Sequence, residues 1–292
     1  LDINTGKILW SKNNIAPFNS QIKIYKDKFF VIDFENTLKA YSVQDGKEIW
    51  TIKTQNPLIR SQKKLSIVII KNKIYFNNSS GDISAVDIKS GELLWQMPTQ
   101  SSLVSGQSFS LKTSDIIADN KALFFSNNKN NFYSLDIQTG TLNWQQKINS
   151  NLRPTLIDNY IITVTLEGYL VIIEKNSGNI IRITDIFKDY AQRKKIVDCK
   201  FKELWQCKGS NIPKYYLPFM SKKNNSLIIP TGFIVGASDI YLSTDRGRLF
   251  IVDITTGITK SVLKIDNRKI SRPLVLNKNL FIITDNSIIK LN

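Results

Sequence analysis

The two cysteines and the complete absence of histidine limit the chemistry that this chain of 292 residues can carry. Cys199 and Cys207 are separated by seven residues, and two thiolates alone leave the tetrahedral shell of a zinc ion incomplete. A disulfide between them is the other expectation, because an even cysteine count is typical of chains that fold in an oxidising compartment. The sequence therefore predicts no metal site and a loop closed by the pair Cys199 and Cys207.

The remaining polar residues do not form a recognisable catalytic set. Without histidine, Ser-His-Asp and Cys-His nucleophiles are excluded, as are histidine general bases. The chain has neither the glycine pattern of a P-loop nor that of a dinucleotide-binding turn. Carboxylates are numerous, but most lie in one repeated turn, so no pair is indicated as acid and base. We predict a protein that is not an enzyme and has no cofactor.

This turn belongs to a repeat in which a glycine is followed four residues later by tryptophan. The four pairs are Gly6 and Trp10, Gly46 and Trp50, Gly91 and Trp95, and Gly140 and Trp144, and two weaker copies combine Gly178 with Arg182 and Gly257 with Ser261. From Gly6 to Gly178, successive glycines are 40, 45, 49 and 38 residues apart. This spacing matches the period of about 40 residues of a four-stranded propeller blade. An Asp or Glu lies four residues before most of the glycines, where it is expected to accept hydrogen bonds from turn amides.

The segments between the turns have the pattern of short antiparallel strands. Residues 73–77 and 82–88 are rich in β-branched and aromatic residues and flank the polar turn 78–81, as expected for a hairpin. A sheet of four such strands cannot bury both of its faces alone, so the sheets must stack around an axis. We expect a set of tryptophans to fill the gaps between neighbouring blades. They are Trp10, Trp50, Trp95 and Trp144.

The repeat count predicts an all-β propeller with six four-stranded antiparallel blades in this chain and eight in the intact protein. Residue 1 already lies inside a repeat turn, so we expect an N-terminally truncated chain in which residues 1–10 complete the last blade and close the ring. We predict a single domain over residues 1–292. Residues 187–226 have neither a glycine turn nor a strand period, which indicates an inserted surface loop, with a decayed blade as the alternative.

The net charge of +16 is the feature that would favour a nucleic-acid or anionic membrane partner. Lysines are spread along the whole chain, and the densest basic run, 193–195, lies in the predicted insertion. A solvated loop is the ordinary explanation of such a run. No apolar run approaches the roughly 18 residues that a membrane span needs. The sequence therefore indicates neither a nucleic-acid partner nor a spanning segment.

The unit Leu-Asp-Ile-x-Thr/Ser-Gly-x-x-x-Trp, with Gly-x-x-x-Ala-Val-Asp before it, resembles the PQQ-like propeller repeat over nearly all of the chain outside the insertion. Two branches share this repeat. Quinoprotein dehydrogenases bind pyrroloquinoline quinone and calcium at the propeller centre, whereas the BamB family of lipoproteins serves outer-membrane β-barrel assembly without catalysis. The dehydrogenases have adjacent cysteines and much longer chains, whereas the cysteines here are separated and most loops are short.

The resemblance to the BamB family implies a periplasmic scaffold, anchored to the outer membrane through a lipidated N-terminus outside this chain. It implies a BamA-like subunit as partner and unfolded outer-membrane proteins as further partners. A quinoprotein dehydrogenase and a general ligand-binding propeller of the cell envelope are the alternatives.

The same resemblance implies a partner-binding loop. Counted in repeats from the C-terminus, residues 57–61 occupy the position of a Leu-x-Leu-Arg segment through which BamB-family proteins contact their partner subunit. Leu58, Ile59 and Arg60 are therefore the predicted partner-binding residues, since apolar anchors beside a multidentate donor suit a small interface. An ordinary loop with one buried Leu is the alternative, and the next such loop offers Lys112 where acidic residues are expected.

Overall fold

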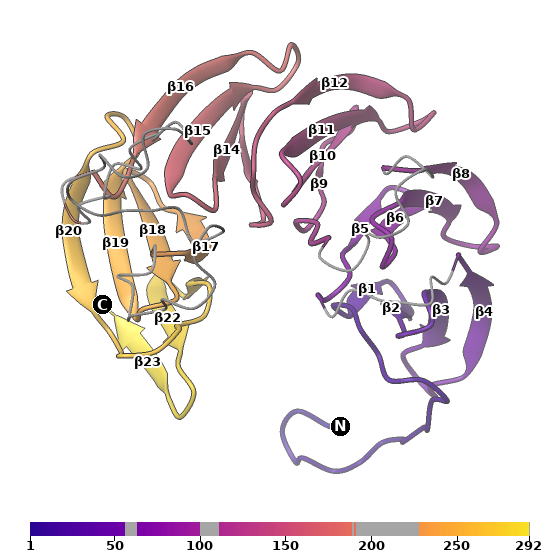
Figure 1. Ribbon diagram of the computed structural model, residues 1–292. Helices are drawn as coiled ribbons and strands as arrows, with labels where there is room; N and C mark the ends of the chain where they lie inside the picture. Colours follow the sequence, from indigo (N-terminus) through magenta and orange to yellow (C-terminus); the bar gives the residue numbers. More distant parts are fainter. Residues whose placement is uncertain (56–62, 100–110, 189, 191–227, 292) are drawn as a thin grey trace, which may run out of the picture.

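The computed structural model describes residues 1–55, 63–99, 111–188, 190 and 228–291. These residues form 23 strands in six antiparallel sheets, five with four strands and one with three. Figure 1 shows the sheets following one another around an arc in the order of the chain. The prediction of an all-β propeller with six blades in this chain is confirmed, and we number the blades 1 to 6 along the chain.

The first three blades hold the N-terminal half of the chain. Blade 1 contains β1 (Lys23–Tyr25), β2 (Lys28–Ile32), β3 (Thr37–Ser42) and β4 (Glu48–Lys53). Blade 2 contains β5 (Ile67–Ile70), β6 (Lys73–Asn77), β7 (Ile83–Asp87) and β8 (Leu93–Met97). Blade 3 contains β9 (Ile117–Ala118), β10 (Ala122–Asn127), β11 (Asn131–Asp136) and β12 (Leu142–Gln146).

The last three blades complete the arc. Blade 4 contains β13 (Thr155–Ile157), β14 (Tyr160–Val164), β15 (Tyr169–Glu174) and β16 (Ile180–Asp185). Blade 5 contains β17 (Pro230–Val235), β18 (Asp239–Thr244), β19 (Arg248–Asp253) and β20 (Thr259–Lys264). Blade 6 contains β21 (Leu274–Leu276), β22 (Asn279–Ile283) and β23 (Ile288–Leu291).

Each blade is a meander, because its strands are hydrogen-bonded to one another in chain order. The first strand of a blade faces the inside of the arc and the fourth strand lies on the outside (Figure 1). The second and third strands between them are the most buried; β10, for example, has no exposed residue. This arrangement leaves the first strands as the wall of the central space.

The predicted closure of the ring by residues 1–10 is wrong in this structure. Among the described residues, none before Lys23 belongs to a strand, and blade 6 keeps three strands. Trp10 instead packs on blade 1, where its Nε1 donates to the Val43 carbonyl oxygen at 2.9 Å and its ring stacks on Phe29. The strand that residues 1–10 were expected to extend, β23, lies at the other end of the arc (Figure 1). Without that edge beside them, these residues have no partner for a sheet.

Each of the four repeat tryptophans lies against the blade that follows it along the chain. A Cβ atom placed on Gly46, Gly91, Gly140 or Gly178 would lie within 2.7 Å of the indole carbons of the preceding Trp. These glycines also have φ values between +66° and +76°, which side chains disfavour. Turn and tryptophan therefore form one contact at which only glycine leaves room for the ring.

A second contact repeats at the same seams between blades. The carbonyl three residues before the turn glycine accepts a hydrogen bond from the preceding blade, as Trp50 Nε1 donates to Ile88 at 3.2 Å and Trp144 Nε1 donates to Lys175 at 2.8 Å. Arg182 stands in the Trp position between blades 4 and 5, and its Nη2 donates to the equivalent Ile254 oxygen at 2.6 Å. A guanidinium thus replaces an indole on the same acceptor.

The carboxylates of the repeated turns are engaged by the backbone. Asp87 Oδ1 accepts hydrogen bonds from the amides of Lys89 and Ser90 at 2.8 and 2.9 Å, which lower the pKa of this carboxyl below its ordinary value. Asp2, Asp136 and Asp253 accept corresponding bonds from their own turns. The predicted role of these carboxylates in the turns is therefore confirmed, and they stay ionised as structural acceptors.

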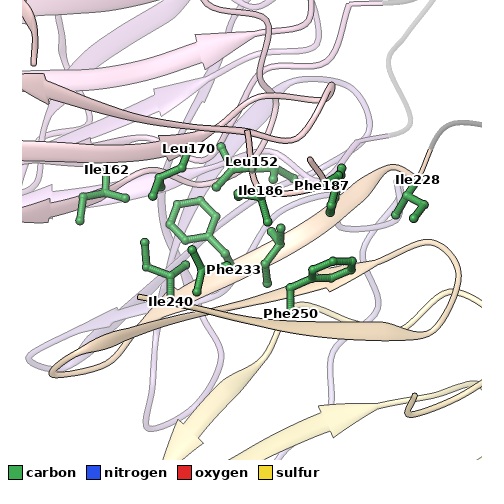
Figure 2. Packing of buried hydrophobic residues seen from close by; sticks show 12 residues of the cluster. Leu152, Ile162, Leu170, Ile186, Phe187, Ile228, Phe233, Ile240 and Phe250 are labelled. Carbon is green, nitrogen blue, oxygen red and sulfur yellow. The ribbon is translucent and has the colours of Figure 1, made fainter. Parts of the chain in front are cut away.

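A cluster of buried residues joins blades 4 and 5, between which Arg182 stands in the position of the repeat tryptophan (Figure 2). Leu170 and Phe187 on the blade 4 side pack with Phe233 and Phe250 of blade 5, and the rings of Phe187 and Phe250 have centroids 4.9 Å apart. Ile228 belongs to the same cluster. Phe187 and Ile228 therefore anchor the chain on either side of the segment 191–227, which is outside the described residues.

Because Phe187 belongs to this core, an insertion within the predicted range 187–226 must begin after it. We predict that the segment is an inserted surface loop, and we therefore expect a chain in which about ten Gly and Ser residues replace 193–225 to unfold cooperatively in urea. Phe187→Ala, which keeps the segment and removes its anchor, should destabilise the protein more than the deletion does. Loss of cooperative unfolding in the deletion variant would instead identify the segment as a decayed blade.

Candidate functional site

The meander order places every connection between blades on one side of the arc. Each first strand begins, and each fourth strand ends, at this side, which we call the front face. The turns with the sequence Thr-Gly or Ser-Gly lie at the opposite side, because each of them joins a third strand to a fourth. The described ends of the connections between blades therefore lie at the front face; these connections are residues 54–66, 98–116, 147–154, 186–229 and 265–273.

The predicted partner-binding residues Leu58, Ile59 and Arg60 fall outside the described residues, as do Cys199 and Cys207. The chain before residue 56 and after residue 62 is held to blade 1 by hydrogen bonds. Thr54 Oγ1 donates to the Asn36 carbonyl at 3.0 Å, and the amide of the buried Leu65 donates to the Asn19 carbonyl at 2.7 Å. Both ends of the 56–62 segment thus lie on the front face, between blades 1 and 2.

The first strands of all six blades enclose a central cavity of about 850 Å³. Its wall is mostly aliphatic, and each blade contributes to it. Representative wall residues are Ile24, Val68, Ile117, Leu156, Ile234 and Leu274. Three basic residues, Lys23, Arg153 and Arg272, also line it. No Asp or Glu is among the described residues that line the cavity.

A recurrent serine fixes the backbone where the first strands begin. Ser20 Oγ accepts the amide of Ile32 at 2.8 Å, and Ser114 Oγ accepts the amide of Ser126 at 2.9 Å. Ser271 Oγ accepts the amide of Ile283 at 2.8 Å in the same way. Each hydroxyl also donates to the carbonyl of the next residue. The residues after these serines are therefore held in equivalent positions around the mouth of the cavity, and they are Gln21, Asp115 and Arg272.

The charges at this mouth act on one another. The pKa of Lys23 is lowered, first by burial and then by the positive charge of Arg153, while Asp115 acts in the opposite direction. Burial and the charge of Arg153 likewise lower the pKa of Arg272, and Asp115 again opposes them. Gln21 Nε2 donates to Asp115 Oδ2 at 3.3 Å. The mouth thus combines three cations with one carboxylate and has a net positive charge.

A fourth cation, Lys63, lies near enough to Asp115 to be attracted by its charge. Its ammonium donates to the backbone carbonyls of Thr113 and Asn151 and thereby connects the loop after blade 1 to the starts of blades 3 and 4. Burial lowers the pKa of Lys63 to about 8, against the opposing attraction of Asp115. Lys63 therefore acts as a structural brace at the front face.

Reasoning from the sequence missed these basic residues. Lys23 and Arg153 lie three residues after Ser20 and Ser150, and Arg272 directly follows Ser271. Ser20 lies 26 residues before Gly46, and Ser114 lies 26 residues before Gly140. A serine with a basic residue one or three positions later is the signal they share, but Ser150 lies 28 residues before Gly178 and no turn glycine follows Ser271, so the repeat spacing alone does not find all three.

The donor set of the centre does not suit a calcium ion with a quinone. Calcium takes six to eight oxygen ligands, mostly carboxylates and carbonyls. The part of the chain that the structure describes has no group of three or more His, Cys, Asp or Glu residues able to hold a metal, and Asp115 stands among cations. In the same part of the chain, no helix is long and apolar enough to cross a membrane.

Comparison with known proteins relates the chain to two groups of propellers. A family model described as outer membrane protein assembly factor BamB matches residues 1–184, which is more than half of the 292 residues. The crystal structure of BamB from Moraxella catarrhalis is similar with a TM-score of 0.72 and 16% identity, over 99% of this chain and 76% of that one. A comparison with curated protein sequences finds no match.

Quinohemoprotein alcohol dehydrogenases share the fold at lower similarity. The enzyme from Comamonas testosteroni has a TM-score of 0.60 and 13% identity, over 85% of this chain and 43% of that one. The enzyme ADHIIG from Pseudomonas putida HK5 has a TM-score of 0.59 and 10% identity, over 89% of this chain and 44% of that one. The chain thus spans less than half of the length of these enzymes, and identities this low show a common fold alone.

Proposed function

The chain belongs to the family of outer membrane protein assembly factor BamB, and from this premise we propose that it is a non-enzymatic scaffold for the assembly of outer-membrane β-barrel proteins. The family match over residues 1–184 is the observation that carries the proposal. The turn carboxylates support it, because Asp87, Asp136 and Asp253 are engaged as acceptors of turn amides. We place the protein in the periplasm, at the outer membrane.

The proposed partner is a BamA-like subunit, and the proposed contact is the connection between blades 1 and 2. Leu58, Ile59 and Arg60 lie in this connection, whose two ends are on the front face. Arg is among the residues enriched at interface hot spots, and its multidentate guanidinium beside two apolar side chains suits a small interface. Unfolded outer-membrane proteins are further proposed partners of the same face.

Joint replacement of Leu58, Ile59 and Arg60 by alanine tests this contact. Each truncated anchor contributes about 1 to 2 kcal/mol to binding, so the dissociation constant for the periplasmic portion of a BamA-like subunit should rise by about 100-fold or more. Titration calorimetry measures the affinity. The melting temperature should stay within about 2 °C of the wild-type value, because loop residues that bind a partner contribute little to the core.

The matched control removes two leucines and one basic residue from the opposite side of the neighbouring blade. Leu93→Ala, Leu94→Ala and Lys89→Ala change residues at or beside the Gly91 turn, of which Leu93 and Leu94 are 42% and 43% exposed. Affinity should be unchanged in this control. Equal weakening in both triple variants, or a large drop in the melting temperature of the first, would assign residues 58–60 to packing.

A quinoprotein dehydrogenase is the competing function, since two structures with this fold are quinohemoprotein alcohol dehydrogenases. The donors at the centre argue against it, because one carboxylate among four cations does not form a calcium site. Uptake of pyrroloquinoline quinone in the presence of calcium, together with dye-linked alcohol oxidation, would overturn the scaffold proposal.

A further inference from the structure

The basic mouth of the central cavity has no part in the proposed scaffold role. We propose that this cavity binds an amphipathic anion, a small molecule with a phosphate or carboxylate head held by Lys23, Arg153 and Arg272 and an apolar body that lies against the aliphatic wall. The inference does not depend on the partner-binding loop. It follows from the charges, the free donors and the wall of the cavity.

The donors at the mouth are free to bind an oxyanion. Among the described residues, neither the ammonium of Lys23 nor the guanidinium of Arg153 has a hydrogen bond or ion pair, and the guanidinium of Arg272 uses only its Nε, which donates to the Phe233 carbonyl at 2.9 Å. The terminal nitrogens of Arg272 and the whole guanidinium of Arg153 therefore remain as forked donors. Such forks match the two oxygens of a carboxylate or phosphate.

The three cations also gain from a counter-charge. They come from blades 1, 4 and 6, so the fold gathers them from distant parts of the chain. The charge of Arg153 disfavours the protonated forms of both Lys23 and Arg272. The single carboxylate of Asp115 is shared between them and accepts a hydrogen bond from Gln21. A bound anion would offset repulsion that Asp115 compensates only in part.

The wall of the cavity accounts for the apolar body. Ile24 and Leu274, next to or near the basic residues, are 68% and 58% exposed although they are aliphatic. Covering such side chains is favourable by the hydrophobic effect. The volume of about 850 Å³ lies within the range of ligand pockets. Charge at the mouth and aliphatic side chains behind it together select an anion that carries a hydrocarbon group.

Titration calorimetry with phenyl phosphate, phenylacetate, phenol and inorganic phosphate tests the proposal at low salt. We expect phenyl phosphate or phenylacetate to bind more tightly than phenol, which lacks the charge, and than inorganic phosphate, which lacks the ring. The tighter of the two aromatic anions identifies the head group. Absence of binding by both, or equal affinity for inorganic phosphate and phenyl phosphate, would overturn the proposal.

Three variants locate the site. Arg153→Gln should weaken phenyl phosphate binding by about tenfold, the effect of losing one charge-assisted pair. Lys129→Gln removes the same charge from an exposed turn outside the cavity and should have no effect. Asp115→Asn can still accept the hydrogen bond from Gln21, so it should tighten binding by about threefold through loss of its negative charge.

The Asp115→Asn result separates the site from general damage, because a misfolded variant does not gain affinity. Melting temperatures check that all three variants are folded. Equal weakening by Arg153→Gln and Lys129→Gln would show that anions are attracted to the basic surface as a whole, and it would overturn the cavity as their site.

Discussion

Replacement of Gly140 by alanine is expected to lower the free energy of unfolding by about 3 kcal/mol. The residue has φ +74°, where a side chain costs about 1 kcal/mol or more. Its new Cβ would also lie 2.5 Å from Trp95 Cε3, so the ring must leave its place at the seam between blades 2 and 3. Forced overpacking of this kind costs about 1 to 3 kcal/mol. Urea unfolding followed by circular dichroism measures the loss.

Gly6 provides the matched control for this substitution. It occupies the same turn of the repeat with φ +68°, but nothing lies within 4 Å of the position of its Cβ. Gly6→Ala should therefore cost only about 1 kcal/mol, which is the backbone contribution alone. Equal losses in the two variants would mean that the tryptophan does not constrain the glycine.

Trp144→Ala is expected to destabilise the protein by about 4 kcal/mol, the usual range for removal of a buried tryptophan. Trp144 is 9% exposed, and its ring stacks on Phe132 with centroids 5.9 Å apart. It also approaches Gly178 of blade 4 and donates to the Lys175 carbonyl. The substitution therefore opens a cavity between two blades and removes a hydrogen bond. Chemical unfolding at several urea concentrations gives the free energy.

Phenylalanine at two of the tryptophan positions separates packing from hydrogen bonding. Among the described residues, Trp95 Nε1 is buried without a partner, because the equivalent Ile137 carbonyl accepts the hydroxyl of Tyr75 at 3.1 Å. Trp144→Phe should therefore cost about 1 kcal/mol more than Trp95→Phe, the net value of one hydrogen bond. A larger loss for Trp95→Phe would contradict this account.

The fold could be predicted from the sequence because the residues that form the contacts between blades occur in a short, repeated sequence pattern. A turn glycine and the Trp four residues after it are close in the chain, and each takes part in the contact with a neighbouring blade. The position of residues 1–10 could not be predicted in this way. Their turn and Trp10 have the same sequence pattern as the other repeats. A strand also needs a neighbouring strand with a free edge, and the sequence of residues 1–10 does not specify where such an edge lies.

The candidate site could be predicted even less well, for a related reason. Lys23, Arg153 and Arg272 are about 120 residues or more apart in the sequence, and each one looks like an isolated surface cation in a basic chain. They meet at the mouth of the cavity only because the blades stand around one axis, with hydrogen bonds of Ser20 and Ser271 fixing the backbone before the first strands of blades 1 and 6. The chemistry of a propeller axis is thus assembled from single residues, one or two per repeat.

The backbone carbonyl three residues before the turn glycine is a common acceptor for side-chain donors of different chemistry. An indole occupies it at Ile88 and Lys175, a phenol at Ile137 and a guanidinium at Ile254. Because the acceptor is a backbone atom, its geometry does not depend on the side chain of the blade that carries it. Neighbouring blades can therefore diverge in sequence, or be exchanged by design, as long as each brings one donor of suitable reach to the seam.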